Sequence, residues 1–233
     1  MEKWQEKYKE KICSPDEAIQ KIKSAKRISF GHICSESSVL TEALIRNKKL
    51  FKKLEIDHLL SIGKCEYAKE ENSEYFHHNA LFIGPKTREA ANSSYGDYTP
   101  IFFYETAKIF GKDGDLSPDA MLLQVSTPDE HGYCSYGLSC DYTKSATESA
   151  KIVVAQINKF VPRTLGNCFI HIDDIDYIII EDKKNKDNLE KIFILPLFGK
   201  FQANNFLIAY EIAKIYGISD EIIQKGLDEI SLA

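Results

Sequence analysis

Residues 125–139, "VSTPDEHGYCSYGLS", contain the densest group of turn-forming residues that could also bind a ligand. Pro128, Asp129, Gly132 and Gly137 stand in this segment, which follows an apolar run typical of a strand. Loops at the carboxyl ends of parallel strands are where α/β sheets bind ligands, so these four are candidate substrate-binding residues. A structural crossover loop would use the same glycines for its turns, and local chemistry alone favours that simpler interpretation.

Two more segments have the same layout. Residues 29–44 place Gly31 and Ser35 between a short apolar run and a helix start, where hydroxyl and N–H groups could hold an anion. The alternative there is an ordinary capped helix. Lys86 and Arg88 follow another apolar run and could contact a phosphate or carboxylate. Neither GxGxxG nor GxxxxGK[ST] occurs, so no dinucleotide or P-loop site is predicted.

No catalytic residue can be assigned from these segments. His32, Cys34 and Asp97 could be assembled into a Cys–His or Ser–His–Asp arrangement, but no spacing favours it, and we discount it. The six cysteines form no CxxC pair and the histidines include one close pair, at 77–78, so no metal site is expected. Without an export signal, the thiols are expected to be reduced.

The elements that must position these segments alternate between strands and helices. Strands are predicted at 27–32, 54–63, 80–84, 99–105, 120–126 and 151–158, with two β-rich pieces within 168–182. Helices are predicted at 16–24, 37–47, 86–94, 106–111 and 142–150. Ser14 and Glu17 have the spacing of a capping box, with Pro15 in the first turn. This alternation predicts an α/β fold with a mainly parallel open sheet and flanking helices.

Composition limits the class of protein. The 233 residues are 43% hydrophobic and 28% charged, with a net charge of −5, as in a soluble globular protein. Because no Lys/Arg stripe occurs, no nucleic-acid partner is expected. No apolar run is long enough for a membrane span, and the charged N-terminus does not resemble a signal peptide. We therefore expect a cytoplasmic protein without membrane contact.

Several separated stretches together resemble the first half of the acetyl-CoA hydrolase/transferase family, in particular the 4-hydroxybutyrate CoA-transferases. They include "LLSIGKCEY", "FIGPKTREAANSSYGDYTPIFFYE" and "MLLQVSTPDEHGYCSYGLS", and the resemblance spans about residues 10–182. It implies an enzyme of two α/β halves with the active site between them. In that family a Glu carboxylate attacks an acyl-CoA thioester and then carries CoA as a glutamyl thioester.

The resemblance also implies what this chain lacks. The family's nucleophilic Glu and its glycine-rich oxyanion loop belong to the second half, and neither has a match here. The family usually has a proline in the loop after the first strand, where this chain reads "CSESSVL", whereas "STPDEHG" is intact. We expect a component that uses coenzyme A or acyl-CoA as substrate, has no covalently bound cofactor, and needs a C-terminal half. The alternative is a non-catalytic scaffold.

The C-terminal part reads differently. A polar junction, 183–191, separates the α/β domain, 1–182, from a helical appendage, 192–233. The appendage resembles the end of the central domain of Mur ligases, with Gly199, Phe201 and Asn205 at matching positions and Gln202 in place of Asn. Without a P-loop, no ATP turnover is expected. A natural fusion, a pseudogene and a built chimera would look alike, and the apolar helix predicted at 202–216 could pair two chains.

Overall fold

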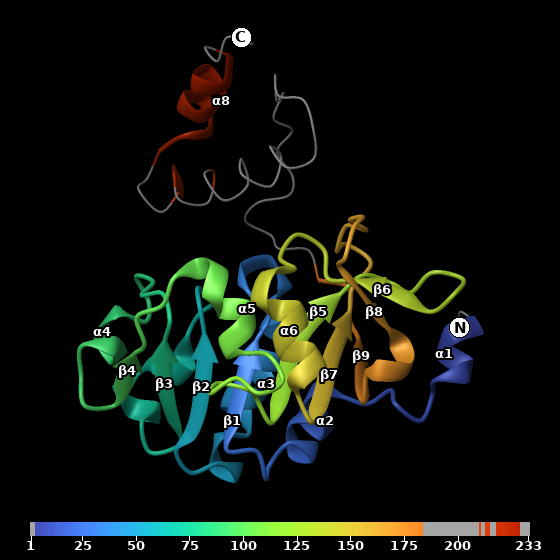
Figure 1. The fold of residues 1–233 in the computed structure, drawn as a ribbon, viewed down its shortest axis with the longest axis horizontal. Coiled ribbons are helices and arrows are strands. Elements are labelled where there is room, and N and C mark those ends of the chain that lie inside the picture. The colour runs from blue at the N-terminus through green and yellow to red at the C-terminus, as the bar shows by residue number, and fades with distance from the viewer. Residues whose placement is uncertain (1–2, 184–209, 211–212, 215–217, 229–233) are drawn as a thin grey trace. The chain divides into compact units, whose positions relative to one another are not determined.

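The computed structural model describes residues 3–183, 210, 213–214 and 218–228 (Figure 1). The chain forms two compact units, residues 1–183 and 184–233, and each is described by itself.

The first unit is built on a seven-stranded sheet with the order β4-β3-β2-β1-β5-β7-β9. Its strands are β1 (Arg27–Phe30), β2 (Leu54–His58), β3 (Phe76–Ala80), β4 (Gly96–Tyr98), β5 (Ala120–Val125), β7 (Ile152–Ile157) and β9 (Tyr177–Ile180). Every neighbouring pair is parallel, which confirms the predicted α/β class. A separate antiparallel pair joins β6 (Tyr133–Ser135) to β8 (Phe169–His171).

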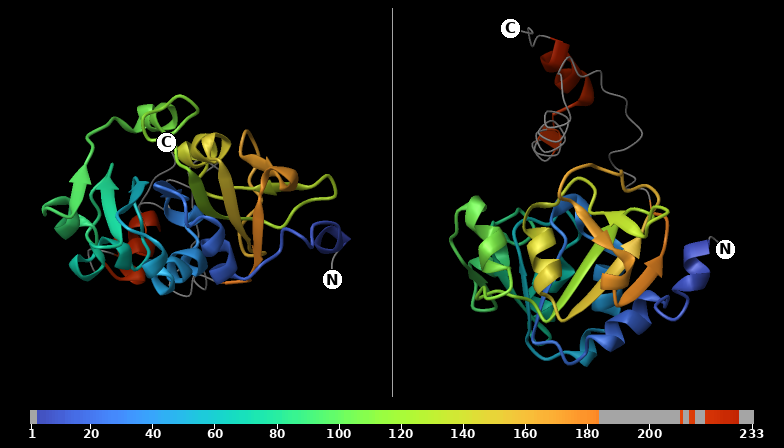
Figure 2. Two further views of the ribbon diagram at one scale, coloured as in Figure 1. Left: turned by 90° about the horizontal axis from the view of Figure 1, so that it is seen from below. Right: turned by 45° about the vertical axis from the view of Figure 1, so that its right-hand side comes forward.

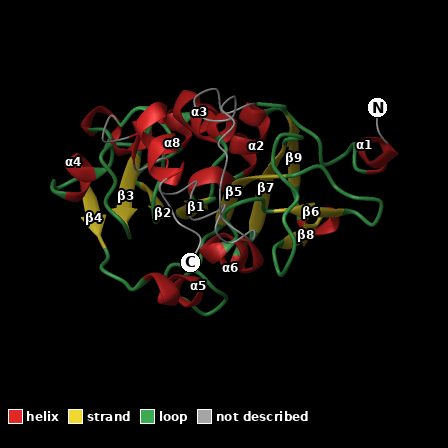
Figure 3. Cartoon of the chain, turned by 90° about the horizontal axis from the view of Figure 1, so that it is seen from above, coloured by secondary structure: helices red, strands yellow, loops and turns green. Residues whose placement is uncertain are grey.

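Helices cover both faces of this sheet (Figure 3). On one face lie α2 (Pro15–Lys21) and α3 (Ser38–Arg46), and on the other lie α5 (Thr106–Ile109) and α6 (Asp141–Ser149). Two short helices, α1 (Lys3–Lys7) and α4 (Arg88–Ala91), lie toward opposite ends of the sheet (Figure 1).

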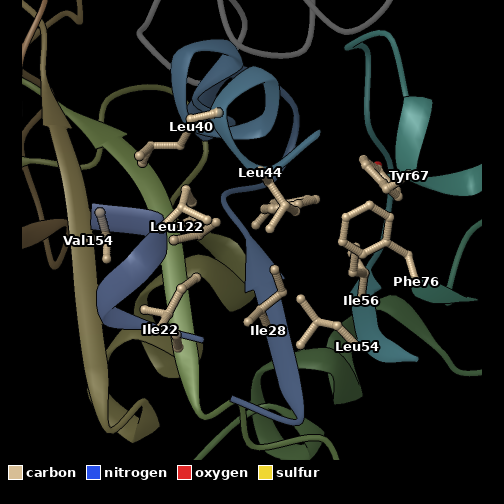
Figure 4. Packing of buried hydrophobic residues seen from close by; sticks show 14 of the residues in the cluster. Ile22, Ile28, Leu40, Leu44, Leu54, Ile56, Tyr67, Phe76, Leu122 and Val154 are labelled. Atoms are coloured by element: carbon tan, nitrogen blue, oxygen red, sulfur yellow. The ribbon is translucent and has the colours of Figure 1, made fainter. Parts of the chain in front are cut away.

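The apolar run of β5 is explained by this double covering. Leu122 packs into the core under α2 and α3 together with Ile28 and Leu44, as Figure 4 shows. Its neighbours Met121 and Leu123 point to the opposite core. Because successive side chains of a strand face opposite sides, a strand covered on both faces is apolar at most of its positions.

The predicted start of α2 is confirmed. Ser14 Oγ accepts a hydrogen bond from the backbone N–H of Glu17, and the Glu17 carboxylate accepts from the Ser14 backbone N–H at 2.8 Å. The two bonds satisfy donors that would otherwise be unpaired at the helix end.

Two strand predictions were wrong in position. The strand expected at 80–84 is β3, at 76–80, and the segment 99–105 contains a loop and a 3-10 helix, Phe103–Glu105, instead of a strand. Polar side chains disguised β3, because they find partners inside the sheet: His78 Nδ1 lies 2.9 Å from the carbonyl oxygen of Ile56, and the Asn79 amide donates to Asp57. The predicted loop 125–139 also contains β6.

The N-terminal segment runs along the outer edge of β9 (Figure 2). Ile12 forms a parallel bridge with Ile178, whose carbonyl oxygen accepts from the N–H of Cys13 at 3.0 Å. The N–H of Ile178 donates to the carbonyl oxygen of Lys11 at 2.8 Å. Of the four residues of β9, Ile178 is therefore paired on the outer edge of the sheet.

In the second unit the described residues include helix α8 (Asp220–Asp228). Asp220 accepts a hydrogen bond from the hydroxyl of Tyr210 at 3.0 Å and pairs with Lys214 at 3.3 Å. Most of the helix predicted at 202–216, and all four Mur-ligase-like positions, lie outside the described residues. No described helix of either unit is long and apolar enough to cross a membrane.

Candidate functional site

The order in which the chain adds strands to the sheet reverses between β1 and β5, and this switch point defines a candidate site. From β1 the chain proceeds outward through β2 and β3 to β4, and then returns to β5 on the other side of β1. The loops that leave the carboxyl ends of β1 and β5 therefore diverge. Open α/β sheets bind ligands at such a point.

The loop after β1, residues 31–37, is tightly folded. Gly31 lies so close to Ser35 that a Cβ placed on it would be 2.1 Å from the Ser35 carbonyl oxygen. The Ser35 hydroxyl lies 2.9 Å from the carbonyl oxygen of Tyr136 and 2.8 Å from that of Ser139, on either side of Gly137. The structure thus brings these three predicted site residues together, with Ser35 fully buried between two loops.

Asp129 organises the loop after β5, which also contains Pro128 and Gly132. One of its carboxylate oxygens accepts from the backbone N–H groups of His131 and Tyr133, both at 2.9 Å. The other pairs with Arg163. These bonds hold the turn in shape, and the Asp129 carboxylate is used in contacts within the protein.

The two basic residues predicted to bind a ligand, Lys86 and Arg88, have different surroundings. Lys86 donates to the carbonyl oxygen of Gly63 at 2.8 Å and so lies against the loop after β2. Arg88 is exposed at the first position of α4.

Glu36, which the sequence did not single out, is buried in the loop after β1 with 7% of its surface exposed. The hydroxyl of Ser61 donates to Oε2 at 2.6 Å, and Oε1 has no hydrogen-bond partner. Gly63 makes room for this carboxyl group, because a Cβ there would lie 2.4 Å from Oε1. Burial raises the pKa of Glu36 to about 6, although Ser61 and the charge of Lys86 act in the opposite direction.

This raised pKa predicts a pH-dependent stability. A carboxyl group whose folded pKa lies above its unfolded value of 4.5 favours folding most at low pH, and the contribution is lost as pH rises through about 6. At 1.36 kcal/mol per unit, the loss between pH 4 and pH 7.5 is about 2 kcal/mol. We expect Glu36→Gln, which keeps an oxygen for Ser61, to remove this part of the dependence. Urea unfolding of both proteins across that range measures it, and parallel curves for the two would contradict the burial argument.

A second unforeseen feature is a histidine–aspartate pair beside the same loop. His32 Nδ1 lies 2.6 Å from Asp141 Oδ2 at the start of α6, and the His32 backbone N–H donates to Thr143 Oγ1. The imidazole also lies 5.6 Å from the ring of Tyr142 and 6.2 Å from that of Phe103, measured between ring centroids. The arrangement of His32 with Asp97 that the sequence analysis discounted does not form, because Asp97 pairs with His77.

A chain of side-chain amides fixes this edge of the sheet. Gln124 donates to the carbonyl oxygen of Cys34, and the amide of Asn158 donates to Gln124. Ser37, the N-cap of α3, donates to Gln156, whose own amide donates to the carbonyl oxygen of Glu181. Connected polar networks of this kind hold loops in one arrangement. The loop after β1 is thereby tied to the ends of β5, β7 and β9.

The arrangement provides groups that can exchange protons: an imidazole oriented by a carboxylate and a buried carboxyl group. Over residues 3–183 and the described part of the second unit, no cluster of His, Cys, Asp or Glu could hold a metal ion. Cys134 and Cys140 have pKa values raised to about 12, mainly by burial, so neither is an activated thiol.

Relatives with known activities share this part of the chain. Over 176 residues it is 51% identical to the 4-hydroxybutyrate coenzyme A transferase of Clostridium kluyveri, covering 76% of this chain and 41% of that protein. It is 34% identical over 177 residues to the succinyl-CoA:cyclohexane-1-carboxylate CoA transferase of Geobacter metallireducens, covering 76% of this chain and 40% of the relative.

A solved structure agrees. The crystal structure of a 4-hydroxybutyrate CoA-transferase from Porphyromonas gingivalis superposes with a TM-score of 0.65 and 31% identity, over 83% of this chain and 43% of that one. The chain therefore spans less than half the length of these proteins. Residues 1–189 match the family described as "Acetyl-CoA hydrolase/transferase N-terminal domain". Together with the parallel sheet, this match shows that the chain belongs to the acetyl-CoA hydrolase/transferase family and contains its N-terminal domain.

Proposed function

We propose that this chain is the N-terminal half of an acyl-CoA:carboxylate CoA-transferase and turns over only with a C-terminal half. The 51% identity to a 4-hydroxybutyrate coenzyme A transferase carries this proposal, because it extends over only 41% of that relative. The substrates would be an acyl-CoA and a free carboxylate, with no covalently bound cofactor. The nucleophilic carboxylate would come from the second half.

The separated halves provide the test. The full chain alone should show no exchange between acetyl-CoA and a carboxylate, since removal of a covalent nucleophile abolishes the two-step route. Addition of the remaining C-terminal part of the Clostridium kluyveri relative should restore exchange, and the same mixture with that part's nucleophilic Glu replaced by Gln is the control. A glutamyl-CoA adduct trapped with borohydride on this chain alone would contradict the proposal. A mixture that forms a complex without turnover would favour the non-catalytic scaffold instead.

For the C-terminal appendage we propose a structural role in pairing two chains, without nucleotide turnover. The resemblance of residues 192–232 to a Mur ligase segment motivates the second part, since no P-loop accompanies it. Ile222 supports the first part: it lies on α8 with 63% of its surface exposed, which is unusual for so large an apolar side chain.

The pairing role predicts a change in mass. Ile222→Asp should convert a dimer to a monomer, because a charge buried without a partner opposes the apolar contact. Light scattering reports the mass, and Gln224→Ala, on the opposite face of the same helix, is the matched control. A monomeric wild-type chain would rule out the role.

A further inference from the structure

The pair formed by His32 and Asp141 is placed to transfer a proton at the edge where the sheet changes direction. His32 belongs to the loop after β1, and Asp141 is the first residue of α6, on the other side of the switch point. Their 2.6 Å contact uses Nδ1, so Nε2 is the nitrogen left to gain or lose a proton. This is how a carboxylate orients an imidazole that acts as a base.

The described residues do not completely enclose the imidazole of His32, whose side chain is 10% exposed. Nε2 makes no hydrogen bond with any described residue. Glu36 Oε1, on the same loop, is by contrast fully enclosed.

The surroundings of His32 suit the end of a long, partly apolar molecule. Phe103, whose ring lies beside the imidazole, is 58% exposed. Its neighbours Phe102 and Tyr104 are 70% and 79% exposed, and their rings stack at 5.9 Å. Phe103 thus offers an exposed apolar surface next to the imidazole, against which the end of an alkyl chain could pack.

We propose that His32 holds the proton of the CoA sulfur during acyl transfer, with Asp141 as its positioning residue. The inference rests on the proposed function, because it takes the thiol of coenzyme A as the ligand. When a carboxylate of the second half attacks the acyl-CoA, the carbon–sulfur bond breaks and the sulfur leaves with the bonding pair. The proton on Nε2 moves to this sulfur, so the imidazolium becomes a neutral imidazole that keeps Nδ1–H donated to Asp141.

The return step reverses each movement. The thiol gives its proton back to Nε2 as the sulfur attacks the anhydride carbonyl, and the acid leaves as a carboxylate. No net proton is gained or lost over the cycle. Proton sharing with an imidazole offsets the low thiolate content of an alkyl thiol at neutral pH.

Two substitutions of His32 distinguish proton transfer from a purely structural role, in which His32 would only join the loop after β1 to Asp141 of α6. Asn at position 32 can still donate to Asp141 but has no atom in place of Nε2, whereas Gln provides a donor near Nε2 and loses the Asp141 contact. His77 provides a matched control. Its Nε2 lies 2.8 Å from Asp97 Oδ2, and it stands near the amino end of β3, whereas the candidate site lies at the carboxyl ends of the strands.

The experiment measures calorimetric binding of CoA and of its analogue with hydrogen in place of the thiol, to the full chain with the second half added. His32→Asn should weaken CoA about tenfold and leave the analogue unchanged, His32→Gln should weaken CoA less, and His77→Asn should alter neither. Equal binding of CoA to wild type and His32→Asn would overturn the inference and leave the proposed function standing. Equal weakening of both ligands by His32→Asn would show a clamp and also overturn it. If neither ligand binds, the proposed function fails and the inference fails with it.

Discussion

Gly31→Ala should destabilise the N-terminal unit by about 3–5 kcal/mol, among the largest effects of any single methyl group in this chain. The added Cβ would lie 2.1 Å from the carbonyl oxygen of Ser35 and 2.5 Å from its carbonyl carbon. These are backbone atoms held by the buried Ser35 side chain, so they cannot move aside without opening the loop that contains His32 and Glu36. Urea unfolding followed by circular dichroism measures the loss.

Gly166→Ala is the control for this substitution. Gly166 has a φ of +108°, but a Cβ there would meet nothing within 4 Å. Its replacement should therefore cost only the backbone strain, about 1–2 kcal/mol. If both variants lose the same free energy of unfolding, the close approach of Gly31 and Ser35 has no special importance.

Arg27→Met should cost about 1.4 kcal/mol at pH 8 through Asp57, because this buried carboxyl group, with a pKa of about 7 beside Arg27, must take up a proton when the cation is removed. Arg27 Nε lies 2.9 Å from Oδ2 of the fully buried Asp57, and its guanidinium also pairs with Glu55. Burial raises the pKa of Asp57 to about 7, with Glu55 adding to the rise and Asn79 and Arg27 opposing it. Removal of Arg27 takes away one of the two opposing effects, and the pKa should rise further.

The sign of the pH effect follows from that direction. A carboxyl group with a raised folded pKa favours folding below its unfolded value of 3.8, and the benefit is lost as pH rises through about 7. The deficit of Arg27→Met should therefore be several-fold smaller at pH 5 than at pH 8. A second change, Asp57→Asn, should restore most of the stability at pH 8. An equal deficit at both pH values, with no rescue, would show that the loss comes from the stem of Arg27 and from its 2.6 Å bond to the carbonyl oxygen of Asp115.

Apolar periodicity predicted the parts of the fold whose side chains are uniformly buried. The runs that became β5 and β7 could be recognised because strands covered on both faces admit few polar residues. β3 could not, since His78 and Asn79 are buried with partners from β2, and a sequence does not show which strands are neighbours. The aromatic run at 102–104 was wrongly predicted as a strand. Its apolar residues suggested burial, but their side chains are exposed in the structure.

The sequence indicated the loops of the candidate site but not Glu36 or the pairing of His32 with Asp141, and ligand binding by these loops stays a prediction. The loops after β1 and β5 were identified from turn residues, and they do lie at the edge where the sheet changes direction. Glu36 gave no signal, because an isolated Glu in a polar loop is usually exposed, and its burial depends on Gly63 from the loop after β2. His32 and Asp141 are 109 residues apart, a separation that no local spacing can reveal.

The segment that borders β9 has a consequence for solubility. β9 is the last strand of the sheet and reads "YIII", so its free N–H and C=O groups would offer an apolar template for a strand from another molecule. Residues 11–13 occupy part of that edge through their bonds to Ile178. The Lys11 ammonium lies 2.7 Å from the carbonyl oxygens of both Asp173 and Ile175, which places a charge at the approach to the strand. We therefore expect residues 11–13 to hinder edge-to-edge pairing of β9 with another molecule, a role separate from any chemistry at the switch point between β1 and β5.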